Sequence, residues 1–191
     1  MIAHRGLKTF ENKTGFFPYV LKRRNVRGIE FDVHRNSKRE LVVTHNYTER
    51  DKLSSEPLSM LPKFDKTNLV LDIKTFNNDA IEIARDVVHE TRFMMDDHEW
   101  YLCSFNRKCV EELVRLNEGK YKCGYITNGY MLGWPIVKDI DFISIYWGYI
   151  TTDRVKNYHD KGIKVFAWTV PRDRVEELQK MGVDEVIVDI Y

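Results

Sequence analysis

Residues 28–33 read Gly-Ile-Glu-Phe-Asp-Val, with two carboxylates set two positions apart among apolar neighbours. On a β-strand, residues i and i+2 point to the same face, so Glu30 and Asp32 lie together on one side. The apolar residues around them would pack toward helices, and the carboxylates would then face a closed interior, where unpaired charges are costly. The stretch therefore predicts a strand whose inner face carries a charged site.

Short apolar runs of this kind alternate with amphipathic segments along the chain. Eight runs are predicted strands: Ile2–Gly6, Gly28–Val33, Leu69–Lys74, Trp100–Ser104, Lys122–Ile126, Asp141–Tyr146, Lys164–Val170 and Glu185–Asp189. Four segments between them are predicted helices: Asp79–Arg92, Arg107–Glu118, Thr152–Lys161 and Arg172–Met181. Because parallel neighbouring strands need crossover connections, this alternation favours a parallel sheet.

The number of these units predicts an α/β fold, a (β/α)₈ TIM barrel formed by residues 1–191 as a single domain. The chain of 191 residues is short beside the roughly 250 typical of that fold. We therefore expect a compact barrel in which some helices are brief or missing. An open, doubly wound sheet is the competing architecture.

One segment interrupts the alternation of strands and helices. Leu41–His45 is strand-like, but only the polar stretch Asn36–Glu40 separates it from the second predicted strand. That stretch is too short for a crossover, so the two runs should form an antiparallel β-hairpin that extends strand 2. A turn centred between residues 38 and 39 places His45 opposite Asp32, at the carboxyl end of the strand, where barrel enzymes carry their sites.

Ionisable residues stand at the ends of the other early strands. His4 and Arg5 close the first, and Asp72 and Lys74 share a face of the third. Asp72 beside the Glu-x-Asp pair would complete an oxygen-rich site suited to Mg²⁺ or Ca²⁺, with Mn²⁺ as a further candidate. Arg5 and Lys74 would suit a phosphate bound to that metal ion.

Composition sets limits on partners and compartment. The sequence has 30 Lys and Arg against 29 Asp and Glu, a net charge of +1, which gives no global attraction to nucleic acid or to an anionic membrane. Cys103, Cys109 and Cys123 are odd in number and form no Cys-x-x-Cys pair, so a reducing compartment fits best. No signal peptide and no membrane-length apolar run can be read. We expect a cytoplasmic protein without stable membrane insertion.

The combination of motifs resembles one enzyme family. In chain order these motifs are Ile2-Ala3-His4-Arg5-Gly6, Glu11-Asn12, Gly28–Val33, Leu41–His45, Leu71-Asp72-Ile73-Lys74, Ser104-Phe105, Ala167–Val170 and Val183–Asp189. Together they cover essentially the whole chain and resemble the glycerophosphodiester phosphodiesterases, whose fold is a (β/α)₈ barrel. The resemblance implies metal-dependent hydrolysis of a glycerophosphodiester to glycerol 3-phosphate and an alcohol.

The resemblance also implies a role for each matching residue. His4 and His45 would be the acid/base pair; Glu30, Asp32 and Asp72 would hold the metal ion; Arg5 and Lys74 would bind phosphate; and Phe105 and Trp168 would shape the substrate side. The chain departs from the family in having Asp72 where a glutamate is common. The stretch between His45 and Asp72 is also too short for the insertion that caps the site in other members.

Two other functions fit the same residues. A phospholipase D-like enzyme acting on lipid phosphodiesters would need apolar surface around the barrel mouth, for which Met60-Leu61, Tyr130-Met131-Leu132 and Tyr146-Trp147 are candidates. A non-catalytic barrel that binds phosphate-bearing ligands is the second alternative. Survival of both histidines and all three carboxylates argues against it, since losing any one of them would abolish activity.

Overall fold

The computed structural model describes residues 1–23, 25–52, 55–63, 66–76, 78–94, 99–129 and 137–191. Its strands are β1 (Ile2–Leu7), β2 (Phe10–Glu11), β3 (Gly28–Arg35), β4 (Leu41–Val43), β5 (Glu56–Pro57), β6 (Asn68–Ile73), β7 (Glu99–Ser104), β8 (Lys122–Thr127), β9 (Phe142–Tyr146), β10 (Lys164–Trp168) and β11 (Glu185–Ile190). Its α-helices are α1 (Phe17–Leu21), α2 (Ala80–Arg92), α3 (Arg107–Leu116), α4 (Thr152–His159) and α5 (Val175–Lys180).

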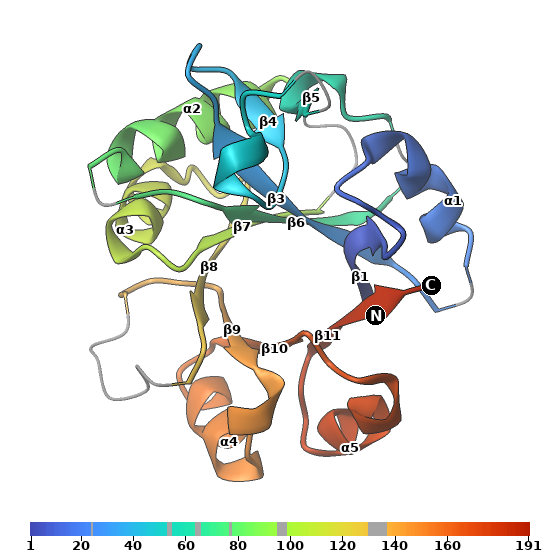
Figure 1. Ribbon diagram of the computed structural model, residues 1–191. Helices are drawn as coiled ribbons and strands as arrows, with labels where there is room; N and C mark the ends of the chain where they lie inside the picture. The colour runs from blue at the N-terminus through green and yellow to red at the C-terminus, as the bar shows by residue number, and fades with distance from the viewer. Residues whose placement is uncertain (24, 53–54, 64–65, 77, 95–98, 130–136) are drawn as a thin grey trace.

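Eight of these strands close into a parallel barrel. Around the ring they follow the order β1, β11, β10, β9, β8, β7, β6 and β3, and β3 pairs with β1 to complete the circle. The helices lie outside this ring (Figure 1). The prediction of a closed (β/α)₈ barrel is therefore confirmed, and the open sheet is excluded.

The short chain builds this barrel with reduced helical cover. The helix α1 has five residues and α5 has six. Between β3 and β6 the described residues form β4, β5 and single 3₁₀ turns, with no α-helix. The longer helices begin as expected from sequence; the Asn106 side chain, for example, accepts hydrogen bonds from the first turn of α3. None of the described helices is long and apolar enough to cross a membrane.

Apolar side chains fill both sides of the barrel wall. The larger cluster lies between the sheet and the helices, and a second cluster fills the interior, where Tyr101, Phe142 and Phe166 pack against one another. Gly124 makes room for this stacking, since a Cβ there would stand 2.3 Å from the Phe142 ring. The interior is thus solid below the mouth, which leaves the carboxyl ends of the strands for a site.

The predicted hairpin forms, but its register differs by one residue from the prediction. Val33 pairs with Val43 and the Thr44 N–H donates to the Asp32 carbonyl, so Thr44 rather than His45 lies opposite Asp32. The reason is the turn: Arg39 adopts a left-handed conformation at φ 68°, and the loop closes through the pair Asn36–Glu40. That loop has three residues between its closing pair rather than a symmetric two-residue tip.

Candidate active site

A cavity of about 180 Å³, called here the mouth cavity, opens at the carboxyl ends of the barrel strands. The nine residues singled out from the sequence all line it: His4, Arg5, Glu30, Asp32, His45, Asp72, Lys74, Phe105 and Trp168. Its floor is apolar, because Val70, Cys103, Ile126 and Ile187 belong to the interior cluster. Charged side chains therefore line the wall of the cavity, and apolar side chains form its floor.

An irregularity in β1 brings two consecutive residues into this cavity. The pairing of β1 with β11 shifts register between Ala3 and Leu7, and Arg5 and Gly6 have φ values of 52° and 77°. In a regular strand His4 and Arg5 would point to opposite faces, whereas a bulge re-aims one of them. The bulge also turns the Arg5 N–H toward Glu30, to which it donates at 3.1 Å.

The three carboxylates come together as the strand pattern predicts. Asp32 and Asp72 are direct partners in the parallel register of β3 and β6. One ligand atom from each of Glu30, Asp32 and Asp72 can be chosen so that all three lie within 4.8 Å of one another. All three residues are buried, with at most 6% of any of them exposed.

Electrostatics at the three carboxylates are uneven. Burial, together with the charges of Asp32 and Asp72, raises the pKa of Glu30 well above its usual range. Burial and the neighbouring Asp32 likewise raise the pKa of Asp72, against the opposing effect of Lys74. Burial acts in the same direction on Asp32, but Lys74 and Arg5 outweigh it and lower the pKa of that carboxyl. Arg5 and Lys74 therefore neutralise Asp32 more fully than Glu30 or Asp72. Among the described residues, the three carboxylates together have only these two permanent cations to compensate their charge.

Direct contacts explain this imbalance. Arg5 Nε lies 3.0 Å from Asp32 Oδ2, and Lys74 Nζ lies 3.0 Å from Asp32 Oδ1 and also contacts Asp72. Asn12 holds the same aspartate at both ends, donating from its amide at 2.9 Å and accepting the Asp32 N–H at 3.0 Å. Asp32 is thus fixed in place by three separate residues.

This donor set fits a hard divalent cation. Asp72 Oδ1 is buried and accepts no hydrogen bond from the residues that the structure describes, and the buried Asp32 Oδ1 has the Lys74 ammonium at 3.0 Å as its recorded contact. Buried carboxylate oxygens of this kind are normally hydrogen-bonded or metal-bound. An all-oxygen set from three carboxylates is the ligand type that Mg²⁺, Ca²⁺ and Mn²⁺ prefer. Glu30, Asp32 and Asp72 would be its ligands.

The two histidines approach the carboxylates from different elements. His4 Nδ1 donates to Asp189 Oδ1 at 2.7 Å, which leaves Nε2 facing Glu30 at 3.9 Å. Burial lowers the pKa of His4, although the Asp189 carboxylate opposes this effect. His45 follows β4 and its Nδ1 donates to the Asn46 side-chain oxygen at 3.1 Å. His34 Nε2 donates to the His45 carbonyl at 3.1 Å and so anchors the backbone of that residue.

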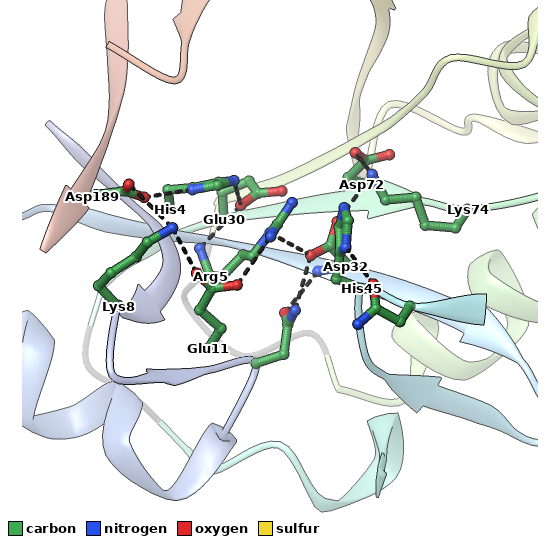
Figure 2. A network of polar contacts seen from close by, with 12 residues as sticks. His4, Arg5, Lys8, Glu11, Glu30, Asp32, His45, Asp72, Lys74 and Asp189 are labelled. Atoms are coloured by element: carbon green, nitrogen blue, oxygen red, sulfur yellow. Dashed lines mark hydrogen bonds and ion pairs between the residues drawn. The ribbon is translucent and has the colours of Figure 1, made fainter. Parts of the chain in front are cut away.

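A chain of polar contacts links the histidine on β1 to the carboxylates (Figure 2). From Asp189 it passes to Lys8 at 3.3 Å, from Lys8 to Glu11 at 2.7 Å, and from Glu11 to Arg5 at 3.0 Å. Arg5 then reaches Asp32. No role was predicted from the sequence for Asp189, Lys8 or Glu11. Asp189 could have been found by the i, i+2 rule, since Ile187 two positions earlier faces the interior.

A second part of the cavity wall is aromatic. The Phe105 and Trp168 rings meet edge to face at 5.6 Å, and Tyr146 packs on Trp168 at 5.5 Å. Lys74 Nζ lies 5.5 Å from the centre of the Phe105 ring, so this wall begins where the charged wall ends. The mouth cavity is therefore divided between a charged half and an aromatic half.

No protein-family model and no curated protein matches the sequence. Solved structures do match. A phosphodiesterase from Oleispira antarctica, solved in complex with the product sn-glycerol-3-phosphate, is 17% identical and has a TM-score of 0.82 over 98% of this chain and 92% of that chain. The chain has the fold of the glycerophosphodiester phosphodiesterases.

Two further structures with this fold are similar to the same extent. The glycerophosphodiester phosphodiesterase of Parabacteroides distasonis is 22% identical, with a TM-score of 0.78 over 98% of this chain and 91% of that chain. The enzyme of Thermotoga maritima is 17% identical, with a TM-score of 0.75 over 98% and 93%. The resemblance seen in the sequence motifs thus extends to the fold of the whole chain.

Proposed function

We propose that residues 1–191 form one catalytic domain, a metal-dependent phosphodiesterase that hydrolyses glycerophosphodiesters to glycerol 3-phosphate and an alcohol. The observation that carries the proposal is the cluster of three buried carboxylates, whose ligand atoms lie within 4.8 Å and which two histidines flank at the mouth of the barrel. The shared fold with glycerophosphodiester phosphodiesterases supports the choice of substrate.

The charged half of the mouth cavity has the groups that phosphodiester hydrolysis needs. A divalent ion held by Glu30, Asp32 and Asp72 would polarise the phosphoryl group and stabilise charge that develops on its oxygens. Arg5 and Lys74 would bind the phosphate. The Arg5 guanidinium group would donate two hydrogen bonds, and the Lys74 ammonium group would act as a compact positive charge. Both already stand at 3.0 Å from Asp32, so they need only turn toward a bound anion.

The histidines would move the protons. One accepts the proton of the nucleophile, either water or a hydroxyl of the substrate itself, and the other donates a proton to the leaving alkoxide. His4 suits this work because its pKa is lowered by burial and Asp189 fixes its tautomer, with Nε2 toward the cavity. His45 lines the same cavity from the hairpin side, where it would act on the other ester oxygen of a bound diester.

Replacement of His4 by alanine tests this assignment. We expect kcat on glycerophosphocholine to fall by about 10²- to 10⁴-fold, the usual contribution of a general acid or base. The rise in melting temperature on adding Mg²⁺ should persist, because the three carboxylates are untouched. Near-normal turnover by the variant would contradict the mechanism.

A lipid-directed phosphodiesterase of phospholipase D type is the second candidate, favoured by exposed aromatic residues around the mouth. Phe76, Phe105 and Tyr146 follow or end barrel strands and are 50%, 43% and 36% exposed. Met60 is exposed as well, whereas Leu61 and Trp147 pack against the core, and Tyr130–Leu132 lie outside the described residues. Faster turnover of lysophosphatidylcholine micelles than of glycerophosphocholine would favour this candidate. Metal binding without turnover of either would favour a non-catalytic barrel.

A further inference from the structure

A second cavity, called here the side cavity, adjoins the mouth cavity on its hairpin side. Its volume is about 220 Å³. It lies between residues 11–13, at the end of β2, and the described residues 44–52 and 55 that follow β4. The residues that line it are Arg5, Glu11, Asn12, Lys13, Val43, Thr44, His45, Asn46, Glu49 and Ser55.

Arg5 and His45 line both cavities, so they form the wall that the two share. Arg5 is one of the two cations placed to hold a phosphate, and His45 is one of the two histidines placed to act on its ester oxygens. A phosphodiester seated between them would therefore extend one of its two arms into the side cavity. The position of the cavity makes it a subsite for part of the substrate.

The charge of the side cavity indicates what that arm is. Two cations, Arg5 and Lys13, balance two carboxylates, Glu11 and Glu49. Both carboxylates already have cationic partners, since Glu11 contacts Arg5 at 3.0 Å and Lys8 at 2.7 Å, and Glu49 contacts Lys52 at 3.3 Å. The lining therefore carries no excess of either charge that would favour an anionic or a cationic arm over a neutral one.

The remaining side chains favour hydrogen bonding over apolar contact. Asn12, Thr44, Asn46 and Ser55 present amide and hydroxyl groups, and Val43 is the one apolar residue among the described residues that line the cavity. Two of them are held firmly: Asn12 is 5% exposed and bonded to Asp32, and the Thr44 N–H donates to the Asp32 carbonyl. Amide and hydroxyl groups each donate and accept, which matches an alcohol that does the same.

We propose that the side cavity binds the neutral, polyhydroxylated arm of the substrate, the glycerol of a glycerophosphodiester or a polyol of similar size. The inference rests on the proposed function and adds the orientation of the substrate. The other alcohol then lies in the mouth cavity against Phe105 and Trp168, where the lining is aromatic. Specificity for the polyol thus comes from the loops after β2 and β4, and specificity for the leaving alcohol from the ends of β7 and β10.

Two substitutions test the subsite without touching the histidines, the cations or the metal ligands. Ser55→Leu fills the side cavity, and Thr44→Val removes a hydroxyl at nearly constant volume. Ser59→Leu is the matched control, because Ser59 is exposed and lines neither cavity. The first readout needs no turnover: affinity for sn-glycerol 3-phosphate relative to inorganic phosphate, measured by titration calorimetry in the presence of Mg²⁺.

We expect the unaltered protein to bind glycerol 3-phosphate more tightly than inorganic phosphate. Ser55→Leu should reduce that preference by about tenfold or more, and Thr44→Val by about fivefold, the loss of one hydrogen bond. Ser59→Leu should keep it. Equal affinity for the two anions in the unaltered protein, or a preference that survives both side-cavity substitutions, would overturn the inference.

A second readout separates failure of the subsite from failure of the proposed function. The ratio of kcat/KM for glycerophosphocholine to kcat/KM for bis(p-nitrophenyl) phosphate, which has no polyol, should fall about tenfold in Ser55→Leu through a higher KM. An equal loss on both substrates would contradict the subsite. Absence of turnover of both substrates by the unaltered protein would refute the proposed function, and the binding measurement would still decide the subsite.

Discussion

Replacing Glu30 by glutamine should stabilise the metal-free protein, although the residue is buried in the centre of the site. Like charges within 4.8 Å of one another repel by about 3.5 kcal/mol per pair at an effective dielectric constant of about 20. Arg5 and Lys74 offset part of this repulsion, but for Glu30 their effect is smaller than that of the two aspartates. We therefore expect a net gain of about 2 kcal/mol, or about 4–8 °C in melting temperature for a chain of this size.

Addition of metal should reverse the order of the two proteins. A ligand present at 100 times its Kd stabilises a protein by about 2.7 kcal/mol. The wild type should gain this amount with Mg²⁺, Mn²⁺ or Ca²⁺, whichever ion binds, whereas Glu30→Gln has lost one of three ligands and should gain much less. Glutamine keeps the shape of the side chain and can still accept the Arg5 N–H, so packing changes little.

Thermal unfolding in EDTA and in each metal ion measures both effects. Glu111→Gln is the matched control, since Glu111 is exposed on α3 and forms a local ion pair with Arg107 of the same helix; a change within about 0.5 kcal/mol is expected there. A melting temperature for Glu30→Gln below that of wild type in EDTA would refute the electrostatic reasoning. A full metal-induced shift in the variant would refute the role of Glu30 as a ligand.

Three further predictions concern residues around the site and in the barrel wall. Asp189→Asn should lower kcat on glycerophosphocholine about 10- to 100-fold with little change in KM, because the carboxylate fixes the tautomer of His4; an unchanged kcat would remove this positioning role. Arg115, and to a smaller extent Arg85, lower the pKa of Glu112 to about 2. The stabilising effect of the Glu112 carboxylate is therefore present above its pKa in the unfolded chain and is lost as the pH falls through about 2. Urea unfolding should show Glu112→Gln costing about 1–2 kcal/mol at neutral pH, and a cost that stays constant toward acid pH would be inconsistent. Gly124→Ala should cost about 1–3 kcal/mol in the same assay, since its Cβ would meet the Phe142 ring, and a neutral effect would mean that the ring can move.

The barrel could be predicted from the sequence because its strands are continuous apolar runs with ionisable ends. Parallel strands are covered on both faces, so a run such as Leu69–Lys74 stands out against the amphipathic helix after it. The register of the hairpin could not be predicted as well. It depends on the left-handed conformation of Arg39, a residue type that gives no sign of it, unlike glycine or asparagine.

The site followed from the same alternation on the strands. Glu30, Asp32 and Asp72 were predicted to share an interior face, and their burial and proximity agree with that prediction. The supporting residues were harder to find. Asn12 reaches Asp32 from a loop whose left-handed backbone, with φ 57° at Asn12, sets the direction of its side chain. Local spacing carries no information on such a contact across 20 residues.

The bulge in β1 shows the limit of strand periodicity most clearly. His4 and Arg5 are adjacent and should face opposite sides, yet both line the mouth cavity. Their position at the end of the first predicted strand, together with the resemblance to a family motif, placed both at the site, whereas the i, i+2 rule alone would have kept only one. Irregular backbone at a site is where sequence patterns of regular structure stop applying.

Release of glycerol 3-phosphate from glycerophosphocholine tests the central claim most directly. The reaction should proceed with the purified protein in the presence of one or more of Mg²⁺, Mn²⁺ and Ca²⁺, stop on addition of EDTA, and resume when the productive ion is restored. Replacing Asp72 by asparagine, which removes a ligand and keeps the side-chain volume, should reduce the rate at least 10²-fold. Turnover that EDTA leaves intact, or no release of glycerol 3-phosphate with any of the three ions, would contradict the account.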